Sequence, residues 1–477
     1  MDSLSEQKVS APLSGHEPAG ETLLSRFGRW WGRKGERDAA GKARPDARAD
    51  AKAAVLPARV LRRQREQLRQ CFDARLTDGA ANTAAQSWRA EYEAAGDDAR
   101  QAMLGVLAEV AASGSAEAGE DGKAGKSASG LSQALSNARI RFFKRLAALH
   151  GEQGGSVCGL HFLIGLRADM LRWHKRVPGL RPLDDDLEAL FSNWFDVGLL
   201  ELQPITWDSP ASLLEKLIRY EAVHEIASWA DLRNRLDSDR RCYAFFHPRM
   251  PREPLIFVEV AFVPEMAANV HALLDEAAPL EDLRRVKWAI FYSISNTQAG
   301  LRGVSFGNFL LKRVIEELQR EFPKLKQFAT LSPIPGFAEW LRKQDGETVA
   351  RVLGDKRLAR WRGDHGSQPA DGAAWLAALP AGSEDAQVRD TALALAAHYL
   401  VRERQQALPA DPVARFHLGN GACVERLNWA ADLSRKGRAQ SLGMMVNYLY
   451  VTEALDDNLA RLGNGNPRIS RAVGKLL

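Results

Sequence analysis

Cysteine is scarce in this chain of 477 residues, and the sequence also lacks several common catalytic motifs. The cysteines are Cys71, Cys158, Cys242 and Cys423. They lie far apart and no CxxC pair occurs, which excludes zinc-ribbon and thioredoxin-type spacing. HExxH is also missing, which argues against a zincin protease. We expect the thiols to be reduced, as in cytosolic proteins.

Long apolar runs are missing too. No stretch reaches the roughly 18–20 apolar residues of a membrane span. The nearest, "CGLHFLIGL", is interrupted afterwards by Arg167 and Asp169. The first residues show no apolar segment before an A-x-A site, so no signal peptide is indicated. We therefore expect no membrane partner and a cytoplasmic location.

Neither sign of charge dominates. The chain has 65 basic and 60 acidic residues, for a net charge of +5. This balance is compatible with an anionic ligand, but without an Arg-rich groove it does not indicate nucleic acid as a partner. A hydrophobic content of 45% with 26% charged residues is typical of globular proteins, and the length suggests two or three domains.

Composition divides the chain into three parts. Residues 1–55 are rich in Gly, Ala, Arg and Asp, and we predict a disordered tail. Residues 56–192 repeat apolar positions at intervals of three and four, which predicts a helical domain. Within it, residues 113–130 are a predicted flexible insertion. Their "GKS" is not a P-loop, because Glu120 stands where the first glycine should be.

Residues 193–477 alternate short β-rich runs with helical patterns, which predicts an α/β domain. The expected strands are "RCYAFFHP", "PLIFVEVAFV", "WAIFYSIS" and "KQFATLS". The last third is expected to be helical again, including "CVERLNWAADLS" and "QSLGMMVNYLYVTEAL". The predicted fold class is therefore α+β and multidomain, with an N-terminal all-helical bundle followed by an α/β domain that carries extra C-terminal helices.

"TLSPIPGFAEW" combines a serine, two prolines and a glycine between a strand and a helix. The order predicts Ser332 as a helix N-cap with Pro333 in the first helical position. A hydroxyl beside unpaired backbone N–H groups can also hold an anion. Ser209 and Pro210 show the same order before another helix, so local sequence alone leaves a plain capping role open.

A second glycine-rich turn follows the strand "WAIFYSIS" and precedes a long amphipathic helix. Glycine lets a backbone approach a ligand closely, and a helix N-terminus offers N–H groups to phosphate, although a plain tight turn would look alike. The order resembles the acyl-CoA-binding half of the GCN5-related acetyltransferase fold, in which a Q/R-x-x-G-x-G/A loop holds the CoA pyrophosphate. "RGVSFG" is a relaxed version, with Ser305 in place of a glycine.

His417 lies in "RFHLGNGA", before a glycine-rich turn and an expected helix. A histidine can donate a proton near neutral pH. No second histidine stands at metal-binding spacing, so the alternative to a proton donor is a hydrogen-bonded structural residue.

The segments "WFDVGLLELQPITWDSP", "SPIPGF", "RFHLGNGA" and "VNYLY" occur in an order that resembles the malonyl-CoA decarboxylase family. The likeness spans nearly all of residues 193–477 and extends more loosely into the helical part. It implies a helical oligomerisation domain, an acetyltransferase-like catalytic domain, and a serine–histidine pair that falls on Ser332 and His417. Residues 1–54 and 113–130 are not covered.

The resemblance implies that malonyl-CoA is converted to acetyl-CoA and CO₂. Its CoA-binding loop falls on Arg302, Gly303, Val304, Ser305, Phe306, Gly307 and Asn308. Asn420 and Tyr450 are further candidates for substrate contact. Because the thioester itself delocalises the carbanion, we expect neither a metal nor a cofactor. The apolar runs "RIRFFKRLAALH" and "CGLHFLIGLRADML" suggest an interface, so we expect a homodimer or homotetramer through the helical domain.

Two other classes stay open at this point. A CoA-dependent N-acetyltransferase would share the CoA-binding fold, but it would not need the Ser332–His417 pair joined to extra C-terminal helices. A non-enzymatic helical scaffold or nucleic-acid binder is disfavoured by the balanced charge.

Overall fold

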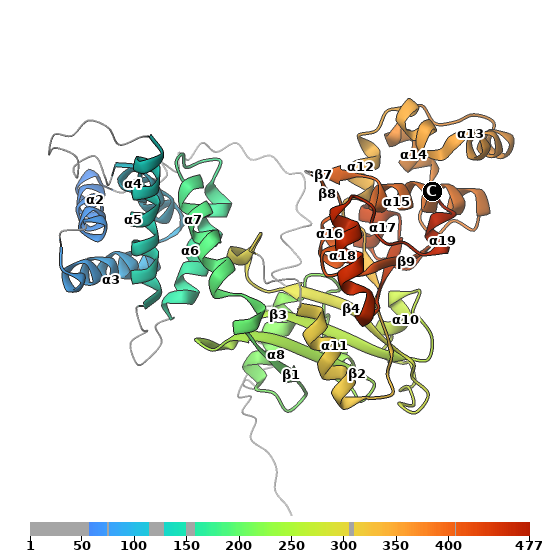
Figure 1. Cartoon of the computed structure of the whole chain (residues 1–477), viewed down its shortest axis with the longest axis horizontal. Coiled ribbons are helices and arrows are strands. Elements are labelled where there is room, and N and C mark those ends of the chain that lie inside the picture. Colours follow the sequence, from blue (N-terminus) through green and yellow to red (C-terminus); the bar gives the residue numbers. More distant parts are fainter. Residues whose placement is uncertain (1–56, 74–75, 114–127, 149–157, 305–309, 406) are drawn as a thin grey trace, which may run out of the picture. The chain divides into compact units, whose positions relative to one another are not determined.

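The computed structural model describes residues 57–73, 76–113, 128–148, 158–304, 310–405 and 407–477, all within one compact unit (Figure 1). The predicted tail at 1–55 lies outside the described residues, and so does most of the predicted insertion at 113–130. None of the helices that the structure describes combines the length and the hydropathy of a membrane-spanning segment.

The first part of the described chain is helical, as predicted. Its helices are α2 (Ala58–Phe72), α3 (Asp78–Ala94), α4 (Asp97–Ser113), α5 (Ala128–Ala148), α6 (Gly159–Trp173) and α7 (Arg181–Trp194). Local sequence fixes some of their ends. For example, the Thr77 hydroxyl accepts a hydrogen bond from the Ala80 N–H and so caps α3.

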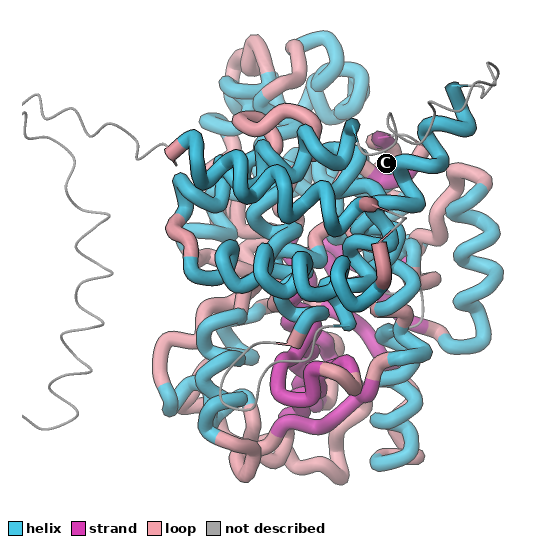
Figure 2. The backbone as a smooth tube through the Cα atoms, turned by 90° about the vertical axis from the view of Figure 1, so that its left-hand side faces the viewer, coloured by secondary structure: helices cyan, strands magenta, loops and turns pink. Residues whose placement is uncertain are grey.

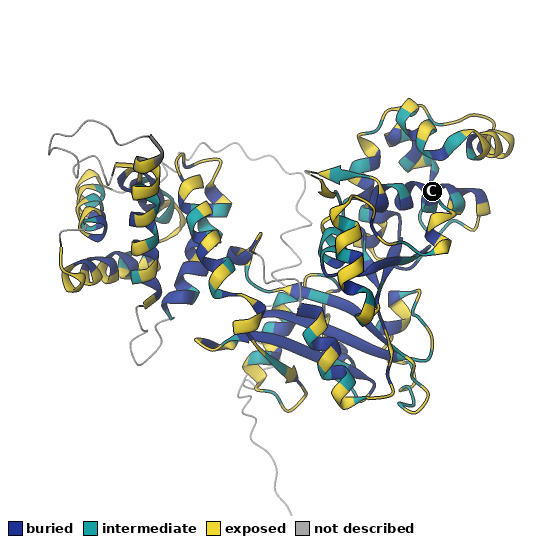
Figure 3. Cartoon of the chain, in the orientation of Figure 1, coloured by how far each residue is buried: buried dark blue, intermediate teal, exposed yellow. Residues whose placement is uncertain are grey.

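The apolar runs that suggested an interface are used inside the protein. Phe142, Phe143 and Leu146 of α5 are fully buried, and so is Leu163 of α6. Figure 3 shows buried stretches along these helices in dark blue. Among the described residues of α2–α7, none is a large hydrophobic side chain with high exposure. Unburied apolar surface therefore gives no support to an interface here, and the expected oligomer rests on the family resemblance alone.

Eight strands of the described chain form one mixed sheet, seen as the main magenta group in Figure 2. They are β1 (Glu201–Ile205), β2 (Arg240–His247), β3 (Met250–Val263), β4 (Trp288–Asn296), β5 (Gln327–Thr330), β6 (Ser332–Pro333), β9 (Cys423–Asn428) and β10 (Met445–Tyr450). The order is β1-β2-β3-β4-β5-β10-β6, and β9 also pairs with β10. Residues 242–246 of β2 and 254–262 of β3 are buried, which explains why they are apolar apart from Glu259.

The parallel strands β4 and β5 separate part of the way along β4. Residues Trp288–Phe291 of β4 pair with Gln327–Thr330 of β5. Beyond Phe291, the pairing of β4 described here is with β3 only, up to Asn296. The C-terminal half of β4 is thus not paired with β5.

The C-terminal third corrects part of the sequence prediction. The segment after His417 was expected to be helical, but Cys423–Asn428 forms β9, and Met445–Tyr450 within the second expected helix forms β10. β10 pairs with β9 along one edge and with β5 and β6 along the other, and it is almost wholly buried. A short apolar run buried on both faces has no alternating pattern, so periodicity alone cannot distinguish it from a helix.

Helices and two short strands complete the fold. Two helices lie between β1 and β2, α8 (Ala211–Tyr220) and α9 (Trp229–Arg235). Later come α10 (Val270–Leu274), α11 (Leu310–Glu321), α12 (Phe337–Arg342), α13 (Gly346–His365), α14 (Gly372–Ala378), α15 (Ala386–Val401), α16 (Pro412–Gly419), α17 (Arg435–Ser441), α18 (Leu455–Gly463) and α19 (Arg471–Gly474). The short 3₁₀ helices are η2 (Val197–Leu199), η3 (Ala299–Leu301) and η4 (Thr452–Ala454), and β7 (Arg404–Gln405) pairs with β8 (Leu408–Pro409).

Candidate active site

Ser332 does not cap a helix, contrary to the prediction. It lies in β6 and pairs with Val446 of β10, while α12 begins only at Phe337 with Gly336 as its N-cap residue. Ser209 is not an N-cap either, because its hydroxyl accepts from the Thr206 N–H in the preceding turn. The prolines on both sides of Ile334 keep the chain extended after Ser332 and delay the helix. A helix N-terminus therefore cannot be the reason for a functional role of Ser332.

His417 lies inside α16 rather than in a turn. The helix starts at Pro412, in the favoured first position, and Asp411 caps it. His417 is on the last turn of α16 and is 2% exposed. Glycine and asparagine at the end of α16 stop the helix and lead the chain directly into β9.

Ser332 and His417 meet in the folded chain, although 85 positions separate them in sequence. Ser332 Oγ lies 3.0 Å from His417 Nε2, and His417 Nδ1 lies 2.8 Å from the Tyr450 hydroxyl. The Ser332 hydroxyl donates to Thr330 Oγ1 over 2.8 Å. Because the Ser332 hydroxyl donates its hydrogen to Thr330, Ser332 Oγ accepts from His417 Nε2. His417 therefore carries its hydrogen on Nε2, and Nδ1 accepts from the Tyr450 hydroxyl.

Strand β10 fixes the other members of this chain of hydrogen bonds. The Tyr448 N–H donates to Thr330 Oγ1, and the Asn447 side-chain amide donates to the Thr330 carbonyl. The Tyr448 ring stacks on the imidazole of His417, with ring centroids 4.6 Å apart. The imidazole is therefore held by ring stacking and by a hydrogen bond at each nitrogen.

Burial controls the charge of the site. Loss of hydration lowers the pKa of His417 to about 3, so the imidazole is neutral at pH 7. Burial also raises the pKa of Tyr450 well above its usual value, so the phenol keeps its proton. The pair is thus a neutral hydrogen-bonding pair, in which the imidazole N–H is a donor and not part of a cation.

A cavity of about 230 Å³ opens beside the pair. It is lined by Val223, Phe291, Tyr292, Ile294, Asn296, Ser332, Pro333, Pro412, Val413, Phe416 and His417. The lining includes the part of β4 that has separated from β5. Mostly apolar walls around a few polar groups are typical of a small-molecule site, and this volume suits the small reacting end of a ligand.

Asp411 links the two halves of the pair, and the sequence analysis did not identify it. It is fully buried, and its Oδ1 accepts from the Val413 and Ala414 N–H groups at the start of α16. Its Oδ2 accepts from the Gly336 N–H, over 3.4 Å, in the turn that follows Ser332. The Asp-Pro pair before "VARFH" is a helix-start signal that could have revealed the capping role.

The predicted CoA-binding residues are described only in part. Arg302 and Gly303 are exposed, Val304 is buried, and Gly303 has φ +84°, a left-handed conformation that favours glycine. Ser305, Phe306, Gly307 and Asn308 lie outside the described residues.

The two further candidates for substrate contact differ in position. Tyr450 contacts His417, as given above, but it does not line the cavity. The Asn420 amide donates to the Phe416 carbonyl of its own helix, and Asn420 is not in the cavity lining either. In the described parts of the chain, no group of three or more His, Cys, Asp or Glu residues is arranged to hold a metal ion.

Fold and site together define a mixed α+β protein with a buried serine–histidine pair beside a ligand-sized cavity. Residues 105–195 match the model of the malonyl-CoA decarboxylase N-terminal domain, and residues 198–477 match that of the malonyl-CoA decarboxylase C-terminal domain. The chain belongs to the malonyl-CoA decarboxylase family.

Relatives of known structure or sequence agree with this. The malonyl-CoA decarboxylase of Cupriavidus metallidurans is 79% identical with a TM-score of 0.79, over 88% of this chain and 100% of that one. That of Rhodopseudomonas palustris is 39% identical with a TM-score of 0.72, over 87% and 99%. The mitochondrial malonyl-CoA decarboxylase of Rattus norvegicus is 38% identical over 335 residues, which are 67% of this chain and 68% of the relative.

The hydroxyl of Tyr450 should affect kcat through its hydrogen bond to His417. We expect Tyr450→Phe to lower kcat about tenfold with little change in KM, because one hydrogen bond of typical strength to Nδ1 is lost. Tyr448→Phe is the matched control, since the Tyr448 hydroxyl has no hydrogen-bond partner in the described structure and its ring would still stack on His417. Steady-state kinetics of the two variants decides this, and equal losses would contradict the role of Tyr450.

The low pKa of His417 should appear in acid stability. The unfolded chain takes up this proton near pH 6.5, whereas the folded chain takes it up only near the lowered pKa of about 3. Between these limits the unfolded state binds more protons, so the free energy of unfolding falls with falling pH by about 1.4 kcal/mol per unit.

His417→Gln removes this contribution while other titrating groups cancel in the comparison. We expect the stability of the wild type relative to His417→Gln to decline steadily from pH 6.5 to pH 4, as measured by urea unfolding at each pH. A difference that does not vary with pH would mean that His417 titrates normally in the folded chain.

Proposed function

We propose that this chain converts malonyl-CoA to acetyl-CoA and CO₂ in the cavity beside Ser332 and His417, without a metal or an added cofactor. The observation that carries the proposal is the 3.0 Å contact between Ser332 Oγ and His417 Nε2, at the wall of a cavity in a member of this family. The malonyl thioester itself accepts the electron pair released on decarboxylation. The protein therefore has to orient the substrate, stabilise the enolate and protonate its carbon.

Orientation comes first. The C–C bond to the carboxylate must stand perpendicular to the thioester plane for its electrons to enter the π system. The pantetheine arm would lie along the free edge of β4, where β4 and β5 have separated, and the acyl end would reach Ser332. Binding energy from the nucleotide end then serves to hold the small acyl group.

Bond cleavage leaves the electron pair on the former malonyl Cα, delocalised onto the thioester oxygen, and releases CO₂. The His417 Nε2–H, shared with Ser332 Oγ in the free site, would be a donor to this developing enolate, and the Ser332 hydroxyl would become a second donor on rotating away from Thr330 Oγ1. A neutral imidazole can donate such a hydrogen bond from its N–H group without becoming a cation, as in other enolate-forming enzymes.

His417 then gives its Nε2 proton to Cα, and acetyl-CoA forms. The Tyr450 hydroxyl at Nδ1 stabilises the ring as negative charge develops on it. After product release, the pair regains one proton from solvent, which balances the reaction. Asn420 is proposed to give polar support to the substrate. Its side-chain amide donates to the carbonyl of Phe416, which lines the cavity, so this support would be indirect.

The finer fold assignment is an acetyltransferase-like CoA-binding arrangement. It is supported by the parallel pair β4 and β5, the separation of the two strands, and the glycine-containing turn that leads from β4 toward α11. The CoA phosphates would lie at residues 302–308. A cytoplasmic location, a homodimer or homotetramer, and the division at residue 193 remain predictions.

The test is direct. Purified full-length protein, treated with a chelator, is incubated with malonyl-CoA and no amine acceptor, and acetyl-CoA and trapped CO₂ are measured. Equal amounts of both products are expected. Consumption of acyl-CoA only when an amine is added would favour the N-acetyltransferase alternative, and activity lost on chelation would contradict the metal-free mechanism.

A further inference from the structure

Arg167 of α6 extends from the helical part of the chain into the turn that follows β4. Its Nη1 donates to the carbonyl oxygens of Gly300 and Arg302, at 2.9 and 2.8 Å. The side chain is 1% exposed, and an arginine at this depth needs partners for its charge. Two of those partners are backbone carbonyls 133 and 135 positions away in sequence.

The rest of the guanidinium is fixed from the other side by α7. Arg167 Nε donates to Asp184 Oδ1 over 2.7 Å, and Nη2 donates to Glu188 Oε2 over 2.5 Å. Charge-assisted hydrogen bonds to two carboxylates hold a planar guanidinium in one orientation. Arg167 is therefore a rigid connection between α7 and the turn.

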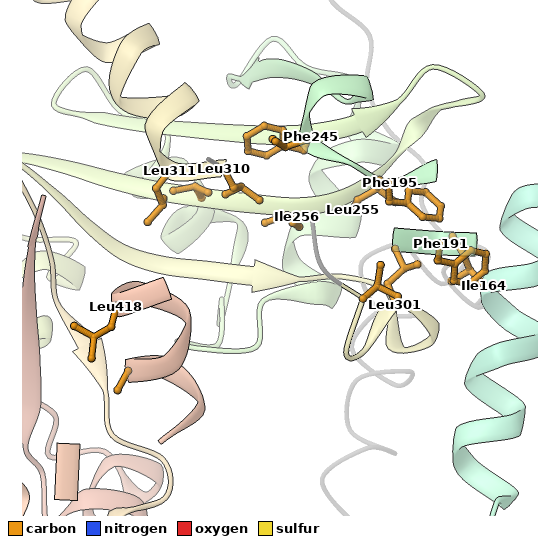
Figure 4. Close-up of a cluster of buried hydrophobic side chains, with 14 of the residues drawn as sticks. Ile164, Phe191, Phe195, Phe245, Leu255, Ile256, Leu301, Leu310, Leu311 and Leu418 are labelled. Carbon is orange, nitrogen blue, oxygen red and sulfur yellow. The ribbon is translucent and has the colours of Figure 1, made fainter. Parts of the chain in front are cut away.

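Close packing accompanies these bonds. A Cβ added to Gly300 would lie 1.8 Å from the Ile164 carbonyl oxygen of α6, so a side chain there would force the turn and α6 apart. Leu301 is 2% exposed and belongs to the same buried cluster as Ile164 and Phe191, which Figure 4 shows around it. The turn is thus held against the helical part by close backbone contact, apolar packing and the two hydrogen bonds from Arg167.

A turn that binds phosphate must present N–H groups and keep its carbonyl oxygens away from the anion. Arg167 holds two of these oxygens. It also balances Glu188, whose carboxylate lies 3.5 Å from the place where a Cβ of Gly303 would stand. Without Arg167, that carboxylate and the two carbonyls would lose the positive charge that offsets them near the turn.

We propose that Arg167 is a positioning residue for the turn at residues 298–304, and that the helical part thereby takes part in binding the phosphates of the CoA ester. This rests on the proposed function only in that a CoA ester binds at this turn. Arg167 touches no reacting atom, so its effect falls on the nucleotide end of the substrate and not on the chemical step.

The experiment compares malonyl-CoA with malonyl-pantetheine, which lacks the nucleotide and its phosphates. In full-length Arg167→Met, we expect KM for malonyl-CoA to rise about tenfold or more, the scale of a lost charged hydrogen bond. We expect kcat to stay within about twofold, and KM for malonyl-pantetheine to stay unchanged, since only the nucleotide interaction is lost. A merely structural role would affect both substrates alike.

Arg139→Met is the matched control. Arg139 is a buried arginine of α5 that pairs with Asp186 of α7, so its ion pair stays within the helices. We expect Arg139→Met to lower the stability of the protein without a selective change in KM for either of the two substrates. Arg167→Lys, which keeps the charge but loses the fork of donors, should restore part of the affinity.

Gly300→Ala tests the same connection if Arg167→Met does not fold. The added methyl group would push the turn away from Ile164 while Arg167 is intact, and the same selective rise in KM is expected. Equal changes for both substrates, or no change in either, would overturn the proposal.

Calorimetry with CoA and with pantetheine separates this proposal from the proposed function, because it needs no turnover. A wild type that binds CoA but releases no CO₂ would contradict the proposed function and leave the Arg167 proposal standing if the variant binds CoA more weakly. A wild type that binds CoA no better than pantetheine would overturn the Arg167 proposal itself.

Discussion

Replacing Ser332 or His417 by alanine is expected to lower kcat for malonyl-CoA decarboxylation by about 10²-fold or more, the scale of a positioned proton donor or a fixed enolate donor. The two residues share one hydrogen bond, so the double variant should lose little more than either single variant. KM should change less than kcat, because the nucleotide end of the substrate contributes most of the binding. The measurement is steady-state formation of acetyl-CoA with each variant.

Ser441→Ala is the matched control for Ser332→Ala. Ser441 is also buried, and its hydroxyl donates to the Met444 carbonyl in the turn between α17 and β10. Its loss should reduce stability by about 1 kcal/mol and leave kcat nearly unchanged. If Ser441→Ala were as inactive as Ser332→Ala, the loss would reflect general disturbance of β10 and the assignment of the pair would fail.

The sequence predicted the helices and the long strands well where one structural period dominates. The amphipathic patterns of α2 to α7 and α11 needed only local information. β9 and β10 were missed because β10 is buried between other strands, and its apolar run lacks the alternation of a half-exposed strand. The choice between helix and strand there depends on tertiary contacts.

The candidate site was predicted from specific motifs and the family they resemble, not from local rules. The local rule at Ser332 was in fact misleading, since the serine lies in β6 and not at a helix start. Thr330 could have been found, because residues two apart on a strand face the same side. Arg167 was visible only as a charge near an apolar run, and its partners at Gly300 and Arg302 cannot be deduced from one sequence.

Asp411→Ala should combine a large loss of stability with a large loss of activity. The carboxylate satisfies the Val413 and Ala414 N–H groups at the start of α16 and also accepts from Gly336. Removing it leaves buried donors without partners, and about 2–4 kcal/mol of unfolding free energy should be lost, from a helix cap plus an unsatisfied buried group. Chemical denaturation measures this part.

The activity part of the prediction follows from geometry. Asp411 is bonded both to the helix that carries His417 and to the turn that follows Ser332, so it sets how the two residues face each other. A shift of α16 by a fraction of an ångström would lengthen the 3.0 Å contact, and we expect kcat to fall about 10-fold to 100-fold in protein that is still folded.

Asp345→Ala is the matched control for Asp411→Ala, because Asp345 caps α13 through the Thr348 N–H but has no bond to either member of the pair. It should lose only about 1 kcal/mol of stability and keep its kcat. Asp411→Asn should recover part of the activity, because the amide oxygen can still accept from the start of α16. If Asp411→Ala kept full kcat at a temperature where it is folded, Asp411 would be a plain helix cap, and the facing of Ser332 and His417 would have to be set by β10 alone.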